Sequence, residues 1–130
     1  MLLGEAKYKL EQLEKRLLEL DLLIVACDAK EVSKHLEEFN QLINKLFQLK
    51  ERISSTERST LFQGRSLESG MIILSTLQKK CGILEKLKTR SDVENNQVVS
   101  ILEQLNSFRE TKRILESALS VCLWSTELNE

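Results

Sequence analysis

Residues 2–27, LLGEAKYKLEQLEKRLLELDLLIVAC, carry the pattern that decides the fold. Their apolar side chains recur at alternating spacings of three and four residues. This spacing places the side chains on one face of an α-helix and is typical of helices that pack along a common seam. Glu5 and Lys9 stand four residues apart with opposite charges, which adds support to a helix. The sequence therefore predicts a helix over 2–27. Its seam comprises Leu3, Ala6, Leu10, Leu13, Leu17, Leu20 and Ile24.

The composition of the 130-residue chain indicates helices and argues against other fold classes. The chain has no proline and four glycines, whereas β-rich and α/β folds need turn residues far more often. Charged residues make up 30% of the chain, yet the net charge is −1 because 19 basic residues nearly balance 20 acidic ones, and the two kinds are interspersed. Nucleic-acid grooves and polybasic membrane patches require a local positive excess. We therefore expect solvated helix surfaces and no nucleic-acid partner.

A second helix is predicted directly after the first. Asp28 followed by Glu31 is typical of a capping box, in which the first residue caps a helix and the fourth reaches back to it. The apolar rhythm then continues to Ile53, before the weak helix former SSTERST at 54–60. Two ends remain open for this helix. It ends near residue 55, or it runs on to residue 68. In the second case Gly70, two residues later, is the helix stop.

A third apolar rhythm begins at Met71. It is interrupted by the almost wholly polar stretch 88–97, in which Ser91 is a candidate cap for a further helix. The apolar residues on either side nevertheless keep one heptad phase: Leu77, Leu84, Val98 and Leu105. A turn gives no reason for that phase to be preserved, so the sequence favours a continuous helix through 88–97.

Two all-α architectures follow from these segments. The first is an antiparallel bundle of long helices over 2–27, 29–68 and 71 onward. The second is an up-down four-helix bundle over 2–27, 29–55, 66–89 and 92–127. Both bury apolar seams and leave charged faces in solvent.

Four parts of the chain carry a family resemblance. They are DAKEVSKHLEEFNQL at 28–42, SLESG at 66–70, the apolar series Leu74, Leu77, Cys81 and Leu84, and Trp124. In this order they resemble the opening and ending of the second helix of a spectrin repeat, its third-helix core, and the first-helix tryptophan of a following repeat. Two features depart from that family. Cys81 stands where a large aromatic residue is usual, and the first helix has no tryptophan near Leu13.

The resemblance to the repeats of spectrin, α-actinin, dystrophin and the nesprins implies a three-helix bundle with a C-terminal helical extension. It implies one domain over 1–130, with a repeat-like core over 1–105 and the extension over 106–130. It also implies a structural function, as a spacer or scaffold in a cytoskeletal or tethering protein.

A second resemblance is carried by ERSTLFQGRSLESG at 57–70 and the heptads after it. This segment is similar to the SNARE motif of Vti-type vesicle-fusion proteins, and Arg90 would fall near the central polar layer. The similarity implies a trafficking adaptor that forms a coiled-coil bundle with partner proteins.

Few residues are candidates for chemistry. His35 is the only histidine, and its charged neighbours indicate a helix edge rather than a base beside a nucleophile. Three cysteines at wide spacings, Cys27, Cys81 and Cys122, indicate neither a disulfide framework nor a zinc site. No phosphate-loop, dinucleotide, zinc-protease or calcium-loop motif is present. We therefore expect no enzyme activity, no catalytic or metal-binding residue, and no cofactor or small-molecule ligand.

The ends of the chain carry the remaining expectations. The start reaches Glu5 before any apolar run, and the longest run, 22–27, is far shorter than a membrane span. We expect a cytoplasmic protein without membrane insertion, bound to other proteins through helix faces. Trp124 and Leu128 are the candidate docking residues. The sequence favours the alternative interpretation of this pair, as core of the last helix or a seam with a neighbouring domain.

Overall fold

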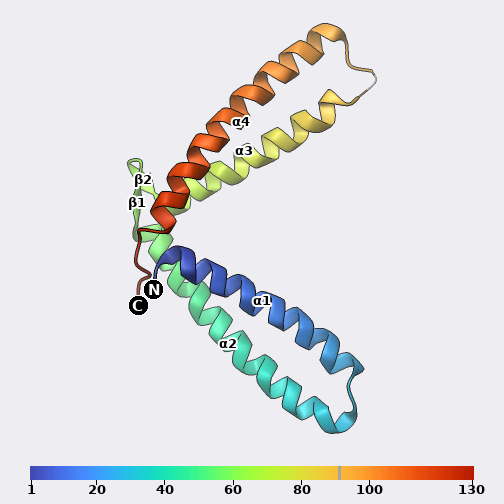
Figure 1. The fold of residues 1–130 in the computed structure, drawn as a ribbon, viewed down its shortest axis with the longest axis vertical. Helices are drawn as coiled ribbons and strands as arrows, with labels where there is room; N and C mark the ends of the chain where they lie inside the picture. The colour runs from blue at the N-terminus through green and yellow to red at the C-terminus, as the bar shows by residue number, and fades with distance from the viewer. Residues whose placement is uncertain (91) are drawn as a thin grey trace. The chain divides into compact units, whose positions relative to one another are not determined.

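The computed structural model describes residues 1–90 and 92–130 and contains four helices and one short β-hairpin (Figure 1). The elements in chain order are α1 (Leu3–Ala26), α2 (Ala29–Ser59), β1 (Leu61–Phe62), β2 (Arg65–Ser66), α3 (Leu67–Lys88) and α4 (Asn95–Leu123). The expectation of an all-helical protein is confirmed. The chain divides into two compact units, unit 1 (Met1–Ser59 with Leu123–Glu130) and unit 2 (Thr60–Cys122).

Unit 1 is built on an antiparallel hairpin of α1 and α2 (Figure 1). The turn lies at Cys27 and Asp28, where the Cys27 amide donates a 2.9 Å hydrogen bond to the Leu23 carbonyl. The predicted seam is buried at Leu3, Ala6 and Leu20, and α2 supplies matching residues from its second half. The buried apolar residues of the hairpin are Leu3, Ala6, Leu20, Leu49 and Ile53.

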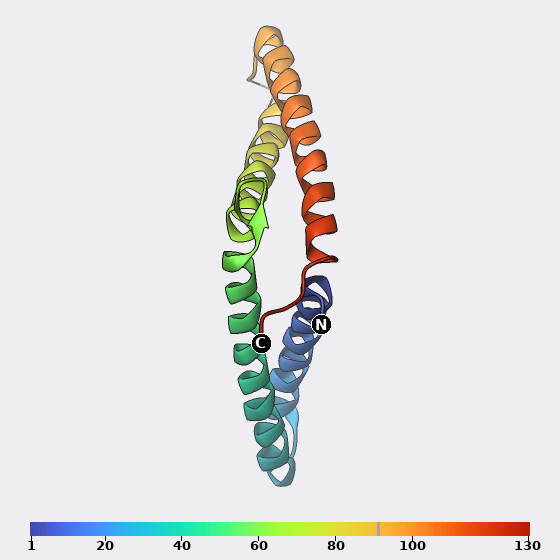
Figure 2. The same ribbon diagram turned by 90° about the vertical axis from the view of Figure 1, so that its left-hand side faces the viewer.

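The C-terminal tail, residues 124–130, completes unit 1 by running past the start of α1 (Figure 2). Leu2 and Glu127 form an isolated antiparallel bridge. The Leu3 amide donates to the Thr126 carbonyl, and the Leu128 amide donates to the Met1 carbonyl, each over 2.8 Å. The tail therefore provides hydrogen-bond partners for backbone groups at the beginning of α1, which have no partner within the helix.

Unit 2 begins with the β-hairpin. Gln63 and Gly64 both have positive φ, 50° and 79°, as a two-residue type I′ turn requires. Ser66 then caps α3, because its hydroxyl accepts a 3.1 Å hydrogen bond from the Ser69 amide. The expectation that 66–70 ends a helix is wrong, since α3 begins at Leu67 and Gly70 lies inside its first turns.

The continuous helix expected through 88–97 is also wrong. Helix α3 ends at Lys88 and α4 begins at Asn95, while Arg90 forms an ion pair with Asp92 in the connection. The proposed cap at Ser91 lies outside the described residues. Leu77 and Leu105 are each buried in a different helix, so their shared heptad phase does not require one continuous helix. The helix bounds match the four-segment division within a few residues, and not three long helices.

The two helix pairs differ in spacing. Cα atoms of α1 and α2 approach within 8 Å along their hairpin, whereas those of α3 and α4 rarely do. Long side chains cross the wider gap of unit 2, where Arg109 forms an ion pair with Glu85. Unit 2 nevertheless has a buried apolar core. It consists of Phe62, Leu67, Leu77, Cys81, Leu105, Leu115 and Leu119.

Candidate interaction surfaces

The two predicted docking residues lie in unit 1 and differ in exposure. The Leu128 side chain is 6% exposed, so it belongs to the core of this unit. Trp124 is 54% exposed, and one side of its ring packs on the backbone of Gly4. A Cβ added to Gly4 would lie 2.7 Å from Trp124 Cδ2, so only glycine leaves room for the ring. Partner binding by Trp124 stays a prediction.

A polar network that the sequence did not reveal anchors the tail to α2. The Asn129 amide donates a 2.8 Å hydrogen bond to Thr56 Oγ1, which itself donates to the Arg52 carbonyl over 2.7 Å. Arg52 Nε returns a 3.0 Å hydrogen bond to the Asn129 carbonyl. Thr56 is 1% exposed. The only sequence signal was the run of hydroxyl side chains at 54–60, which weakened the helix prediction there.

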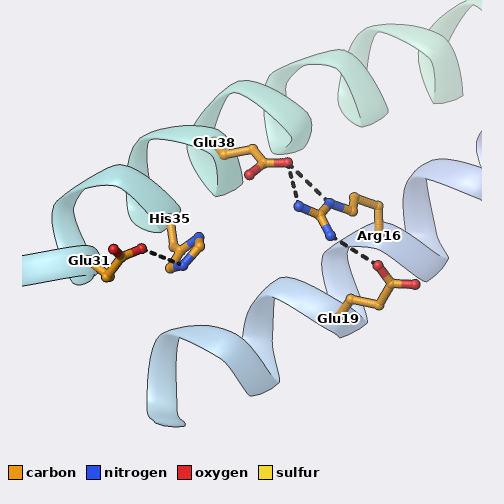
Figure 3. A network of polar contacts seen from close by, with 5 residues as sticks. All are labelled: Arg16, Glu19, Glu31, His35 and Glu38. Carbon is orange, nitrogen blue, oxygen red and sulfur yellow. Dashed lines mark hydrogen bonds and ion pairs between the residues drawn. The ribbon is translucent and has the colours of Figure 1, made fainter. Parts of the chain in front are cut away.

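One side of the α1–α2 hairpin is charged (Figure 3). Arg16 donates from Nε to Glu38 over 3.1 Å and from Nη1 to Glu19 over 3.0 Å. These bonds, first that to Glu19, raise the pKa of Arg16. His35 Nε2 lies 3.6 Å from Glu31, and His35 Nδ1 has no hydrogen-bond partner. The cluster resembles a structural cross-link between two helices, with His35 packed at its edge.

A different side of the same hairpin is apolar. A hollow of about 380 Å³ lies between α1 and α2, lined by Leu17, Leu18, Phe39 and Ile43 with Glu14 and Asp21. Helical spacings of three, four and seven residues continue this surface along both helices. Its further members, all exposed, are Leu22, Val25, Leu36 and Phe47. We call these ten residues the unit 1 apolar face.

The exposure of this face is unusual for a protein surface. Leu22 is 73% exposed and Phe47 is 61% exposed, although both are large apolar side chains. Scattered exposed leucines are ordinary, but a contiguous apolar patch rimmed by polar residues marks an interaction site. A pair of helices can bury only the seam between them, so the remaining apolar stripe of each helix needs another cover.

Unit 2 has its own groove on one side of α3 and α4. A hollow of about 390 Å³ is bounded by the β-hairpin and by the two helices that follow it. Its lining comprises Phe62, Gln63, Arg65, Gly70, Ile73, Thr111, Ile114 and Leu115. A second hollow, of about 440 Å³, lies farther along α3 and α4 and includes Leu87 and Gln97.

Heptad spacing connects the two hollows of unit 2. Ile73, Lys80 and Leu87 are successive seventh residues of α3 and therefore lie along one face of that helix. The Lys80 ammonium lies 5.2 Å from the centroid of the Phe108 ring on α4, so it spans the gap between the helices. We call the first hollow, together with Lys80 and Phe108, the unit 2 groove.

The described residues contain no group of three or more His, Cys, Asp or Glu side chains placed to hold a metal ion. Within the same residues, no helix has the length and apolar character needed to cross a membrane. Comparison with protein-family models, with curated proteins and with solved structures finds no match to this chain.

Proposed function

We propose that this chain is a non-enzymatic structural or interaction module that binds helices of other protein molecules through its helix faces. The unit 1 apolar face is the single observation that carries the proposal. Apolar side chains at three-, four- and seven-residue spacings are the anchors by which helices recognise one another. Three free cysteines, Cys27, Cys81 and Cys122, support a reducing compartment such as the cytoplasm.

The first candidate within this class is a spacer or scaffold of the spectrin-repeat kind. A repeat of that kind needs three helices, and each unit here brings two. In this proposal a third helix from another molecule lies on the exposed stripe. Such a module would link molecules by completing bundles with them.

The trafficking adaptor is the second candidate, and the wide spacing of α3 and α4 favours it. A helix that makes few close backbone contacts can leave its neighbour at low cost and enter a partner's coiled coil. The amides of α4 would then exchange quickly with solvent in the isolated chain. A spacer would instead protect them without a partner.

A pair of leucine substitutions in α1 tests the proposal. Leu22→Glu places a charge on the exposed face, and Leu20→Glu places the same charge in the buried seam. We expect Leu22→Glu to keep the helix content and unfolding midpoint of the parent chain, while a tagged copy purified from its native cells loses its stoichiometric partner proteins. Leu20→Glu should unfold unit 1. Retention of every partner by a folded Leu22→Glu protein would contradict the proposal.

A further inference from the structure

The charges beside the two apolar surfaces have opposite signs. On the unit 1 apolar face the lining carboxylates are Glu14 and Asp21, which stand seven residues apart on one side of α1. Glu14 lies 3.5 Å from Lys50, an exposed pair that leaves its carboxylate accessible to solvent. The hollow itself is lined by no cation. The surface is therefore an apolar strip with an acidic edge.

The unit 2 groove carries the complementary charge. Arg65 lines it from strand β2, and Lys80 continues the face of Ile73 on α3. Both cations are exposed, while the apolar lining comes from Phe62 and Ile114 among others. No carboxylate lines the hollow beside Arg65. This surface is an apolar groove with a basic edge.

We infer that a second copy of this chain covers both surfaces, with the unit 1 apolar face of one molecule seated in the unit 2 groove of the other. This pairing rests on the proposed function and names its partner. Leu18 and Ile43 would pack against Ile73 and Ile114, and the two carboxylates would face the two cations. Each interface would contain two helix pairs, which together enclose a core as in a four-helix bundle.

Charge complementarity favours this pairing over the pairing of two unit 1 apolar faces. Two unit 1 faces placed together would bring Glu14 and Asp21 of each copy toward those of the other, and like charges at an interface disfavour association. Pairing unlike surfaces removes that repulsion. Each molecule offers one surface of each kind, so two molecules that exchange both contacts leave neither surface free to recruit a third.

A charge-swap experiment on the full chain tests the inference. The acidic-edge variant is Glu14→Lys with Asp21→Lys, and the basic-edge variant is Arg65→Glu with Lys80→Glu. The matched controls are Glu37→Lys and Lys79→Glu, which reverse charges at exposed positions. Both positions fall midway between seam residues and therefore lie on the outer sides of α2 and α3. Sedimentation equilibrium measures the mass, and circular dichroism checks that each variant keeps its helices.

The parent chain and both controls should have twice the 15.0 kDa mass of one chain. Each edge variant alone should associate about tenfold or more weakly and sediment as a monomer. An equal mixture of the two edge variants should recover the doubled mass, because each variant now offers the charge that the other needs. A basic-edge variant that still forms dimers alone would overturn the inference in favour of pairing through unit 1 faces. A parent chain that is a folded monomer would also overturn it, while binding of other proteins through Leu22 would leave the proposed function standing.

Discussion

The indole ring of Trp124 packs on the backbone of Gly4, 120 residues earlier in the chain. A methyl group on Gly4 would lie 2.7 Å from Cδ2, 2.8 Å from Cε2 and 3.0 Å from Cε3 of that ring. The first two of these separations are shorter than folded proteins tolerate, so the ring or the helix has to move. The tail and the start of α1 are thus fitted to each other at one position.

Gly4→Ala should therefore loosen the C-terminal tail. We expect a loss of about 1–3 kcal/mol in unfolding free energy from overpacking. Trp124 is the only tryptophan, so its fluorescence reports the displacement directly, as a shift to longer wavelength. Gly82→Ala is the matched control in a helix, because nothing lies within 4 Å of its added Cβ. That control should gain about 0.5–1 kcal/mol.

Gly70→Ala makes the corresponding test in unit 2. An added Cβ would lie 2.7 Å from Phe62 Cδ1 and 3.3 Å from Leu119 Cδ2. We expect Phe62 to be pushed from its site, with the β-hairpin losing protection from amide exchange before α3 does. Gly82→Ala lies in the same helix and should leave the hairpin unchanged. Equal protection of the hairpin in both variants would refute the packing of Phe62 on α3.

Thr56→Val tests the polar anchor of the tail. The substitution keeps the side-chain shape but removes the oxygen that accepts from the Asn129 amide. We expect a loss of about 1–3 kcal/mol by urea unfolding, because Thr56 is buried and its partners lose a hydrogen bond. Thr76→Val is the control, since Thr76 Oγ1 makes a similar bond to the Ile72 carbonyl on an exposed helix surface. An equal cost at both positions would rule out a special role for the anchor.

Two asparagine-to-proline substitutions locate the start of α4. Asn95 is the first helical residue, where proline is tolerated because its missing amide has no helical acceptor. Asn95→Pro should therefore cost less than 1 kcal/mol or so. Asn106→Pro, in the middle of α4, should cost about 3 kcal/mol or more. A large cost at both would restore the continuous helix that the heptad phase suggested.

The first helix shows how much periodicity alone can predict. The predicted helix over 2–27 is α1 within one residue at each end, and its seam residues Leu3, Ala6 and Leu20 are fully buried. Local spacing was sufficient there because α2 follows directly and supplies the partner seam. The same reasoning failed at 88–97, because two antiparallel helices and one continuous helix can share a heptad phase.

The β-hairpin was missed although a signal was present. Gln63-Gly64, between a short apolar pair and a short polar pair, is compatible with a two-residue turn, whereas the predicted helix stop is Gly70. The tail could not have been predicted, since the contacts of Leu128 and Asn129 join residues far apart in sequence.

The sequence predicts the residues of the candidate surfaces only in part. Leu18, Leu22 and Val25 were visible as apolar residues off the seam, but periodicity does not say whether another helix covers them.

The most direct test of the account is photo-crosslinking from the unit 1 apolar face in living cells. A photoreactive amino acid at position 22 should form covalent adducts with protein, and the same group at position 37, on the outer side of α2, should not. Adducts at position 22 with another copy of this chain, mapping to Ile73, Lys80 or Ile114, are the predicted result. An adduct with a different protein would support the proposed function while contradicting self-association. The absence of protein adducts at position 22, in a folded and expressed chain, would contradict the central claim that this face is covered by a partner.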